Sequence, residues 1–579
     1  INAKLKNKEE EIDIENLSLK DSKTFELLQR GETTGIFQLE SRGMRDYLKQ
    51  LVPNDFEDIV SMNALYRPGA LGMNMVDSYI NRKHGKEEVT YGHDAVKKIL
   101  STTYGVIVYQ EQVMQIAQEL SGFSLGQADI LRRAMGKKKK EEMESLRSTF
   151  VEGAVKKDVN ERYAANLFDQ IEQFAGYGFN RSHSVGYALI AYQTAWLKAH
   201  YPAEFMASVL SCDLGNTDNI QLFVDDCKNI GLTVLSPDIN KSSYRFEDLD
   251  SSTILYGLGA IKGIGESLVE QIVNERQSKR FEDMYDFCMR VGFNRVNKRI
   301  LTTLIGSGAM DSLGSREDLF RRIDSCLKNA EQASERNKSN IKDLFGEEII
   351  SPSEEEIDEN IEFDEVTAEW NALGFYLDSH PLENKKREVR KMCGFFISEL
   401  QSEAHKQRIA GCLMQFNVRQ GKRGRFAFAT LDDGSAKIEV SIWADVFEKY
   451  RNLLKKGQVL VVEGIIEKDD YSDSVKHKMI AERILTFDEA RREYIKNIKI
   501  NLENNTEEIN SVVNSLKEIA NSTDGNTVLI SYKGNSAKAD IALPSNFSVK
   551  LDDSSVKALD KRFGAENVEF VYHTQTHIN

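Results

Sequence analysis

A dense run of cations lies between Arg132 and Lys140. The segment ILRRAMGKKKKEEM places two arginines and four lysines within nine residues. About thirty residues later, FAGYGFNRSHSVGYALIAYQTAWLKAHYPAEF gathers glycines, aromatic rings, Arg181 and His183 in a turn before an apolar helix. Fixed cations, exposed backbone N–H groups and flat rings together suit a phosphate-rich ligand that carries a base. Taken alone, the charge run also allows a solvated basic helix face followed by an ordinary buried helix.

Metal chemistry has weaker support in the sequence. Alternating acids could hold divalent ions, and the chain has two such patterns, EIDIE (11–15) and DLD (248–250). The first pattern follows a polar, lysine-rich segment, so we expect a solvated linker there. The second lies in an Asp/Ser cluster, so we expect a loop. The six cysteines show no CxxC or Cys/His ligand spacing, which argues against structural zinc and favours a reducing cytoplasm. We therefore expect no metal ligands in this chain.

Length and composition set the class of protein. The 579 residues predict several domains, and 41% hydrophobic with 29% charged residues is typical of soluble globular chains. A net charge of -15 excludes a uniformly basic nucleic-acid coat, so DNA contacts must come from local patches. We expect no membrane span and no signal peptide, since the chain has no long apolar run and begins INAKLKNKEEE. Without an initiator Met, the chain is expected to begin inside a longer protein.

The first 210 residues read as mainly helical. In GVIVYQEQVMQIAQELSG (105–122), a short strand-like run is expected to continue as a helix. RPG (67–69) predicts a helix end and a turn that could aim Arg67 at a ligand. Turns and short strands are expected between 212 and 255.

A glycine hairpin follows in YGLGAIKGIGESLVEQIVNER (256–276). Gly263 and Gly265 flank Ile264 just before a helix with a regular apolar face, the helix-hairpin-helix pattern. Such a turn can present backbone N–H groups and a helix N-terminus to a DNA phosphate without reading sequence. Lys262 could support that contact, and LTTLIGSGAMDSLG (301–314) repeats the pattern more weakly. A plain glycine-containing helix turn is the alternative.

Residues 408–486 change to β character. Five short strands, GKRG and DDGS turns and one interposed helix predict an OB-fold barrel. Cations and rings that suit single-stranded nucleic acid gather around the first turn. They are Arg419, Lys422, Arg423 and Arg425, with Phe416, Phe426 and Phe428. Some of these rings must also fill the barrel core, so the basic loop is the predicted contact.

Two further segments suggest partner contacts or linkage. IKDLFGEE carries Asp343, Leu344 and Phe345 in a stretch otherwise too polar to pack, as in peptides that dock apolar side chains into another protein. Residues 347–365 are rich in acids and contain no base, which predicts an acidic linker. The last part, 497–579, reads as a small α+β domain.

Several long strings together resemble the replicative alpha subunit of bacterial DNA polymerase III. They are GIFQLESRGMRDYLKQL, ALYRPGALG, YGVIVYQEQVMQIAQELSGFSLGQADILRRAMGKKK, the FAGYGFNRSHS segment and YGLGAIKGIGE. The resemblance implies a multidomain α+β chain with mainly helical fingers, a tandem helix-hairpin-helix module, an OB-fold β-barrel and a small α+β C-terminal domain. The implied divisions are palm-exit linker 1–30, fingers 31–210, connecting region and hairpins 211–330, clamp-binding peptide and acidic linker 331–368, helical connector 369–405, OB-fold 406–490 and tau-binding-like domain 491–579.

The resemblance also implies residue roles. The triphosphate of the incoming nucleotide would meet Arg132 and Arg133. Nucleotide or template positioning would fall to Lys137, Lys138, Tyr177, Asn180, Arg181 and His183. DNA would be held by the hairpin residues and by the basic OB loop. IKDLF would bind the sliding clamp, with Ile341 where the family usually has Gln, and the C-terminal domain would contact the clamp-loader tau subunit.

Catalysis in this family needs Mg²⁺ ions on three palm aspartates, with deoxynucleotides as substrates. By the resemblance those aspartates and the phosphatase-like domain, which binds the proofreading exonuclease, lie before Ile1. We therefore expect the fragment to be inactive alone and to supply cations and grip on primer–template and single-stranded template DNA. A DNA- and partner-binding module without a nucleotide role is the alternative. A helicase or nuclease is disfavoured, because no GxxxxGK[ST] loop occurs.

Overall fold

The computed structural model describes residues 1–2, 11–137, 140–174, 178–292, 294–339, 363–401, 406–468, 477–503, 506–520, 525–533 and 538–573. The chain separates into two compact units, one of Ile1–Ala260 with Ile264–Ser278 and one of Ile261–Gly263 with Lys279–Asn579. Within the described ranges, no helix is both long and apolar enough to cross a bilayer.

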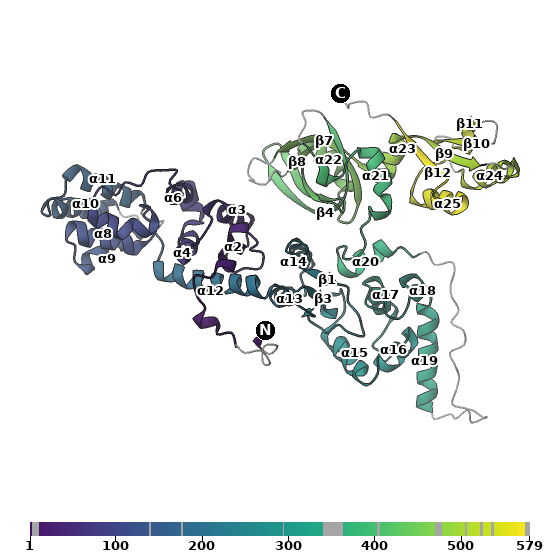
Figure 1. Cartoon of the computed structure of the whole chain (residues 1–579), viewed down its shortest axis with the longest axis horizontal. Helices are drawn as coiled ribbons and strands as arrows, with labels where there is room; N and C mark the ends of the chain where they lie inside the picture. Colours follow the sequence, from purple (N-terminus) through teal and green to yellow (C-terminus); the bar gives the residue numbers. More distant parts are fainter. Residues whose placement is uncertain are drawn as a thin grey trace. The chain divides into compact units, whose positions relative to one another are not determined.

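The first unit is mainly helical (Figure 1). Its α-helices are α2 (Ser22–Arg30), α3 (Arg42–Leu51), α4 (Phe56–Leu65), α5 (Pro68–Gly72), α6 (Met75–Lys83), α7 (Asp94–Leu100), α8 (Gln110–Ser121), α9 (Leu125–Lys137), α10 (Lys140–Val155), α11 (Glu161–Gln173), α12 (Arg181–His200), α13 (Pro202–Cys212), α14 (Thr217–Asn229) and α15 (Glu266–Ser278). A small sheet in the order β1-β3-β2 contains β1 (Thr233–Leu235), β2 (Glu247–Asp248) and β3 (Thr253–Leu255). The predicted helical character of this region is confirmed.

Helices α7 to α11 share one hydrophobic core that includes the buried side chains of Val113, Phe150 and Phe168. The prediction of a short strand before α8 is wrong: in the described residues, Tyr109 forms only an isolated parallel bridge with Phe179. The reason is local, because the side chain of Gln112 accepts hydrogen bonds from the N–H groups of Val108 and Tyr109, at 2.9 and 3.0 Å. Those two groups therefore cap a helix rather than join a ladder.

Helix α12 packs its small-residue face against α2 and α4. Near its C-terminal end, the fully buried Lys198 lies 2.7 Å from Asp226 of α14 and donates to the carbonyl of Thr34 at 2.9 Å. Burial lowers the pKa of Lys198, and Asp226 opposes this shift. A buried charge is tolerated when it is paired and hydrogen-bonded, so this lysine ties α12 to α14 and to the turn that follows Thr34.

The second unit begins with helices and then becomes β-rich (Figure 1). Its α-helices are α16 (Met284–Val291), α17 (Lys298–Gly306), α18 (Arg316–Arg321), α19 (Ile323–Ser339), α20 (Glu365–Leu373), α21 (Lys386–Cys393), α22 (Ala444–Tyr450), α23 (Phe487–Tyr494), α24 (Thr506–Ile519) and α25 (Asp553–Phe563). Its strands are β4 (Gln407–Gly421), β5 (Gly424–Asp432), β6 (Lys437–Ile442), β7 (Val459–Lys468), β8 (His477–Thr486), β9 (Ile495–Glu503), β10 (Thr527–Lys533), β11 (Lys538–Ala542) and β12 (Val568–Tyr572).

Strands β4 to β8 form a closed five-stranded barrel in the order β4-β5-β6-β8-β7. Helix α22 lies between β6 and β7 in sequence, and β6 pairs with β8 in parallel. Inward-facing Leu413, Ala427 and Val440 belong to one core cluster. The OB-fold predicted from five strands and one helix is therefore confirmed. The α+β character of the last part is also confirmed, with a sheet in the order β11-β10-β9-β12 and helices α24 and α25.

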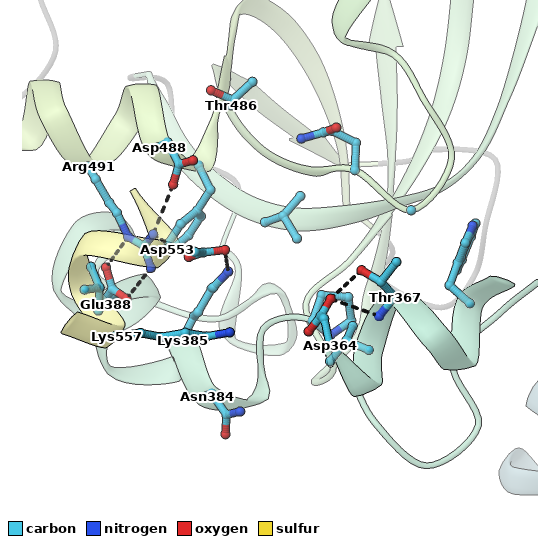
Figure 2. A pocket seen from close by; sticks show the side chains of 18 of the residues that line it. Asp364, Thr367, Asn384, Lys385, Glu388, Thr486, Asp488, Arg491, Asp553 and Lys557 are labelled. Carbon is cyan, nitrogen blue, oxygen red and sulfur yellow. Dashed lines mark hydrogen bonds and ion pairs between the residues drawn. The ribbon is translucent and has the colours of Figure 1, made fainter. Parts of the chain in front are cut away.

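A buried arginine joins α21, α23 and α25 beside a cavity of about 700 Å³ (Figure 2). Arg491 contacts Glu388 at 2.7 Å, Asp488 at 3.0 Å and Asp553 at 2.5 Å. Lys385 adds a second pair with Asp553 at 2.7 Å. Although burial opposes it, these cations hold the pKa of Asp553 below its usual value. The cluster fixes the connector helix against the elements that follow the barrel.

Candidate nucleotide and nucleic-acid interfaces

The first two cations of the basic run lie on α9 and share one counter-ion. Arg132 Nη2 lies 2.8 Å from a carboxylate oxygen of Asp129, and Arg133 contacts the other oxygen. The two arginine side chains are 35% and 65% exposed. Hydrogen bonds from Arg132 and then Arg133 hold the pKa of Asp129 below its ordinary value. Residues three and four apart on a helix are neighbours, so the sequence could have revealed this acid, which the prediction overlooked.

The structure adds little about the two remaining lysines of the predicted triphosphate site. Lys137 is the last residue of α9. Lys138 lies outside the described residues, as does Tyr177 of the glycine turn.

Asn180 is the N-cap of α12. Its Oδ1 accepts from the backbone N–H of His183 at 2.9 Å, and its Nδ2 donates to Glu111 at 2.9 Å. Glu111 also accepts from the backbone N–H of Arg181, at 3.0 Å and 3.2 Å to its two oxygens. The side chain of Asn180 is thus engaged in shaping the turn. Glu111, which the sequence prediction did not single out, anchors the start of α12.

Gln110 links the basic helix to the glycine turn. Its Oε1 accepts from Arg132 Nη1 at 3.4 Å, and its Nε2 donates to the carbonyl of Gly178 at 3.0 Å. The backbone N–H of Gln110 also donates to the carbonyl of Phe179, at 2.9 Å. The two halves of the predicted motif are therefore joined through one side chain from α8. Sequence spacing carries no signal for such a link.

Aromatic and cationic groups surround that turn. The Arg67 guanidinium lies 4.2 Å from the centroid of the Phe179 ring, which is 5.5 Å from the ring of His183. Burial lowers the pKa of Arg67. Arg181 pairs with Glu57 at 2.7 Å. The RPG turn is expected to aim Arg67 at a ligand; in the structure its guanidinium lies on a protein ring, and a ligand contact stays a prediction.

The arrangement combines exposed arginines, a capped helix N-terminus and flat rings. Guanidinium groups bind phosphate oxygens in bidentate fashion, and rings offer faces to bases. Within the described ranges, no group of three or more His, Cys, Asp or Glu side chains is placed to hold a metal ion. The described residues of this site therefore suit anion and base recognition and do not fit a metal centre.

The first glycine hairpin is exposed at its tip. Gly263 has φ +77 and open space around its Cα, so an L side chain there would be strained without clashing. Gly265 is exposed and directly precedes α15. The backbone N–H of Lys262 donates to the carbonyl of Ala372 at 3.0 Å, and its Nζ lies 3.4 Å from the carbonyl of Trp370. The first turn of α15 contains Glu266, which lowers the positive potential that a phosphate would meet there.

The second glycine hairpin is buried. Residues 304–310 are all inaccessible, and a Cβ on Gly306 would lie 2.7 Å from the carbonyl oxygen of Ala368 in α20. Gly306 thus allows close packing of α17 on α20. In this structure the second hairpin does not present its backbone to solvent, which differs from the paired phosphate grip expected from the sequence.

The OB barrel carries rings and cations on one face of β4 and β5. Phe426 and Phe428 alternate with the buried Ala427 and Ala429, so both rings point away from the core. Their ring centroids are 5.5 Å apart, and that of Phe426 is 5.4 Å from Trp443. Trp443 is 48% exposed and did not feature in the sequence prediction.

The cations of this face differ in how they are held. The Arg419 guanidinium lies 5.4 Å from the Phe428 ring centroid, and Arg425 pairs with Glu448 at 2.9 Å. Lys422 and Arg423 are exposed in the turn between the strands. Phe416, by contrast, packs against the barrel core. Cations beside outward rings suit single-stranded nucleic acid.

The predicted clamp-binding residues Asp343, Leu344 and Phe345 lie outside the described residues. Their role stays a prediction.

Comparisons with known proteins agree with the sequence resemblance. Residues 1–158 match the model of the bacterial DNA polymerase III alpha subunit finger domain, residues 231–319 match a helix-hairpin-helix motif and residues 408–486 match an OB-fold nucleic acid binding domain. The chain is 40% identical to DNA polymerase III subunit alpha of Escherichia coli O157:H7 over 98% of its own length and 50% of the relative. For Pseudomonas fluorescens the values are 38%, 97% and 50%, and for Vibrio cholerae 40%, 97% and 50%. The chain thus spans about half the length of these relatives.

Proposed function

The chain belongs to the family of bacterial DNA polymerase III alpha subunits, and from this premise we propose that it forms part of a replicative DNA-directed DNA polymerase. The whole protein would add deoxynucleotides to a primer 3′-OH, directed by a template. This chain would supply the fingers, DNA-binding modules and partner contacts. The cytoplasm is the proposed location.

The observation that carries the nucleotide role is the link through Gln110, which brings the Arg132 guanidinium to the glycine turn at α12. Arg132 and Arg133, with Lys137 and Lys138 following, would neutralise the triphosphate. Tyr177, Asn180, Arg181 and His183 would position nucleotide or template, and Asn180 also caps α12. The primer 3′-OH would lose its proton and attack the α-phosphate, while the bond between the α- and β-phosphates breaks and pyrophosphate leaves. The held cations would keep the α-phosphate in line for attack.

Mg²⁺ would supply charge stabilisation for the attacking and leaving oxygens. The described residues provide no cluster of ligands for it, so we assign the metal to palm aspartates of the whole protein. The 579-residue chain by itself is accordingly expected to show no primer extension with Mg²⁺ and deoxynucleotides. Template-dependent extension by the chain alone would contradict this assignment.

DNA contacts are assigned to three places. Lys262, Gly263 and Gly265 would meet the phosphate backbone of the primer–template duplex. The basic OB face would hold the single-stranded template. Asp343, Leu344 and Phe345 would bind the sliding clamp, the C-terminal domain would contact the clamp-loader tau subunit, and the proofreading exonuclease would bind the whole protein through its N-terminal region.

The test uses inorganic tripolyphosphate and a deoxynucleoside triphosphate with the 579-residue chain. Arg132→Ala and Arg133→Ala are expected to weaken both ligands in calorimetry. Arg147→Ala is the matched control, since it also removes an exposed arginine paired with an aspartate, at 3.0 Å, on α10, a helix that shares its hydrophobic core with α9. In the whole polymerase, the first two variants should raise the KM for deoxynucleotides.

One observation favours a second candidate function. Asp129 forms ion pairs with both arginines, as on a helix face that is stabilised by its own ion pairs. In that case the fragment would be a DNA- and partner-binding module without a nucleotide role. Unchanged affinity for both triphosphate ligands in the two arginine variants would favour this module.

A further inference from the structure

The first turn of α8 contacts the start of α12 along a short parallel junction. The backbone N–H of Phe179 donates to the carbonyl of Val108 at 3.2 Å, and that of Gln110 donates to the carbonyl of Phe179 at 2.9 Å. Tyr109 and Phe179 form a parallel bridge between these two bonds. Residues 108–111 and 178–181, which we call the α8–α12 junction, therefore hold the starts of two helices side by side.

The side chain of Glu111 closes this junction. Its two carboxylate oxygens accept from the backbone N–H of Arg181 at 3.0 and 3.2 Å, and one of them also accepts from Asn180 Nδ2 at 2.9 Å. Glu111 lies in the first turn of α8, and Arg181 is the first residue of α12. A carboxylate is favourable at the positive end of a helix dipole, and this one lies at two such ends. Glu111 therefore fixes where α12 begins relative to α8.

The two glutamines beside Glu111 hold other segments. The side chain of Gln110 connects the carbonyl of Gly178, at 3.0 Å, to the guanidinium of Arg132 on α9, at 3.4 Å. The buried Gln112 donates to the hydroxyl of Thr103 at 2.9 Å and so ties α8 to the segment before it. Three consecutive polar side chains thus hold three different parts of the first unit.

Fold stability accounts fully for only one of the three. Gln112 is buried and caps its own helix, which is a structural role. Gln110 and Glu111 are only half-buried, and a hydrogen bond at such a place contributes about 1 kcal/mol. Each of these two contacts a segment that carries a cation assigned to the nucleotide, Arg132 for Gln110 and Arg181 for Glu111.

We propose that Gln110 and Glu111 are positioning residues for nucleotide addition, which hold the α9 arginines and the start of α12 in one fixed relation. The inference rests on the proposed function and goes beyond it, because neither residue touches the nucleotide in this role. In-line attack requires near-attack geometry, and a displacement of about 1 Å can cost about 100-fold in rate. A correctly paired nucleotide depends on that alignment, so its loss should slow the correct substrate more than a mispaired one.

The experiment measures nucleotide selectivity in the whole polymerase. Glu111→Ala and Gln110→Ala should lower kcat for the correct deoxynucleotide by about 10- to 100-fold, with little change in KM. The ratio of kcat/KM between correct and mispaired deoxynucleotides should fall in both variants. This ratio does not depend on how much enzyme is active, so a purely structural defect leaves it unchanged. Glu111→Gln keeps an acceptor oxygen for the Arg181 N–H and should restore most of the ratio.

Matched controls come from the same helix. Glu119→Ala and Gln115→Ala also remove an acid and an amide from α8, at exposed positions outside the α8–α12 junction. Both should keep the wild-type ratio. An unchanged ratio in Glu111→Ala and Gln110→Ala, or an equal fall in the controls, overturns the inference. Gln110→Ala leaves Glu111 in place and keeps the test available if Glu111→Ala fails to fold.

A binding measurement separates this inference from the proposed function. In the 579-residue chain, unchanged tripolyphosphate affinity in Arg132→Ala refutes the triphosphate site, whatever the α8 variants do. If Arg132→Ala weakens tripolyphosphate but the α8 variants keep full selectivity, only the positioning role fails. Glu111→Ala should leave tripolyphosphate affinity nearly unchanged, because Glu111 holds the backbone of α12 and carries no cation to the phosphates; a loss equal to that of Arg132→Ala contradicts a positioning role.

Discussion

Removal of the carboxylate charge at Asp226 should destabilise the first unit strongly. The side chain of Lys198 is 0% exposed, and its described oxygen partners are the Asp226 carboxylate and the Thr34 carbonyl, the latter at 2.9 Å. In Asp226→Asn, the Lys198 ammonium stays buried without its anionic partner. Breaking a buried pair by removing one partner costs about 3–5 kcal/mol, because the other charge stays desolvated. Lys198→Met combined with Asp226→Asn removes the charge as well and should recover much of that loss.

A local probe is needed because a multidomain chain does not unfold in two states. Trp196 lies in α12 within the first unit, stacked on His200 at 4.5 Å. With Trp370 and Trp443 replaced by Phe, its fluorescence in urea reports that unit. Asp169→Asn is the control, because its pair with Arg147 is exposed and should contribute little. A loss for Asp226→Asn no larger than that of the control would refute the reasoning.

The same pair predicts a pH dependence. Burial lowers the pKa of Lys198 in the folded chain below its ordinary value of 10.5. At pH values between these two pKa values, the unfolded chain therefore keeps a proton on Lys198 that the folded chain has lost. The free energy of unfolding should therefore rise with pH through that window. Lys198→Met should abolish this rise, as measured by the Trp196 transition at several alkaline pH values.

Three further predictions concern the binding surfaces. Asp129→Asn should tighten tripolyphosphate binding, since it frees both α9 arginines; weaker or unchanged binding in calorimetry would argue against competition by this acid. Gly263→Ala should cost about 1 kcal/mol through its left-handed backbone, whereas Gly265→Ala, in open space, should be neutral in thermal melting. Trp443→Leu should weaken a single-stranded oligonucleotide by about 1–3 kcal/mol per stacked base without changing the salt slope of binding, and an altered slope would contradict a stacking role.

Local sequence patterns were sufficient for the elements and for much of the architecture. Five expected strands, the GKRG and DDGS turns and one interposed helix predicted the OB-fold barrel correctly. Such patterns work because side-chain direction repeats with period two in strands and 3.6 in helices. They misjudged the run before α8, where a glutamine side chain captured the backbone donors that a strand would have used.

Tertiary contacts decided what each motif residue faces. The glycines of the two hairpin patterns look similar in the sequence. In the structure, however, Gly263 has open space beside it, whereas Gly306 packs on the backbone of α20. The same limit applies to charge, since the sequence does not say which cation a distant acid will neutralise.

The sequence by itself determined the composition of the α9 and α12 motifs, their helical periods and the family to which they point. Only the folded chain decided that Gln110 joins them and that the ring of Phe37, from a distant turn, lies 5.3 Å from that of Tyr187. The physical reason is the separation of the residues along the chain. Hydrophobic periodicity and helix capping involve residues a few positions apart, whereas these contacts depend on how α8, α12 and the turn at 33–40 pack together.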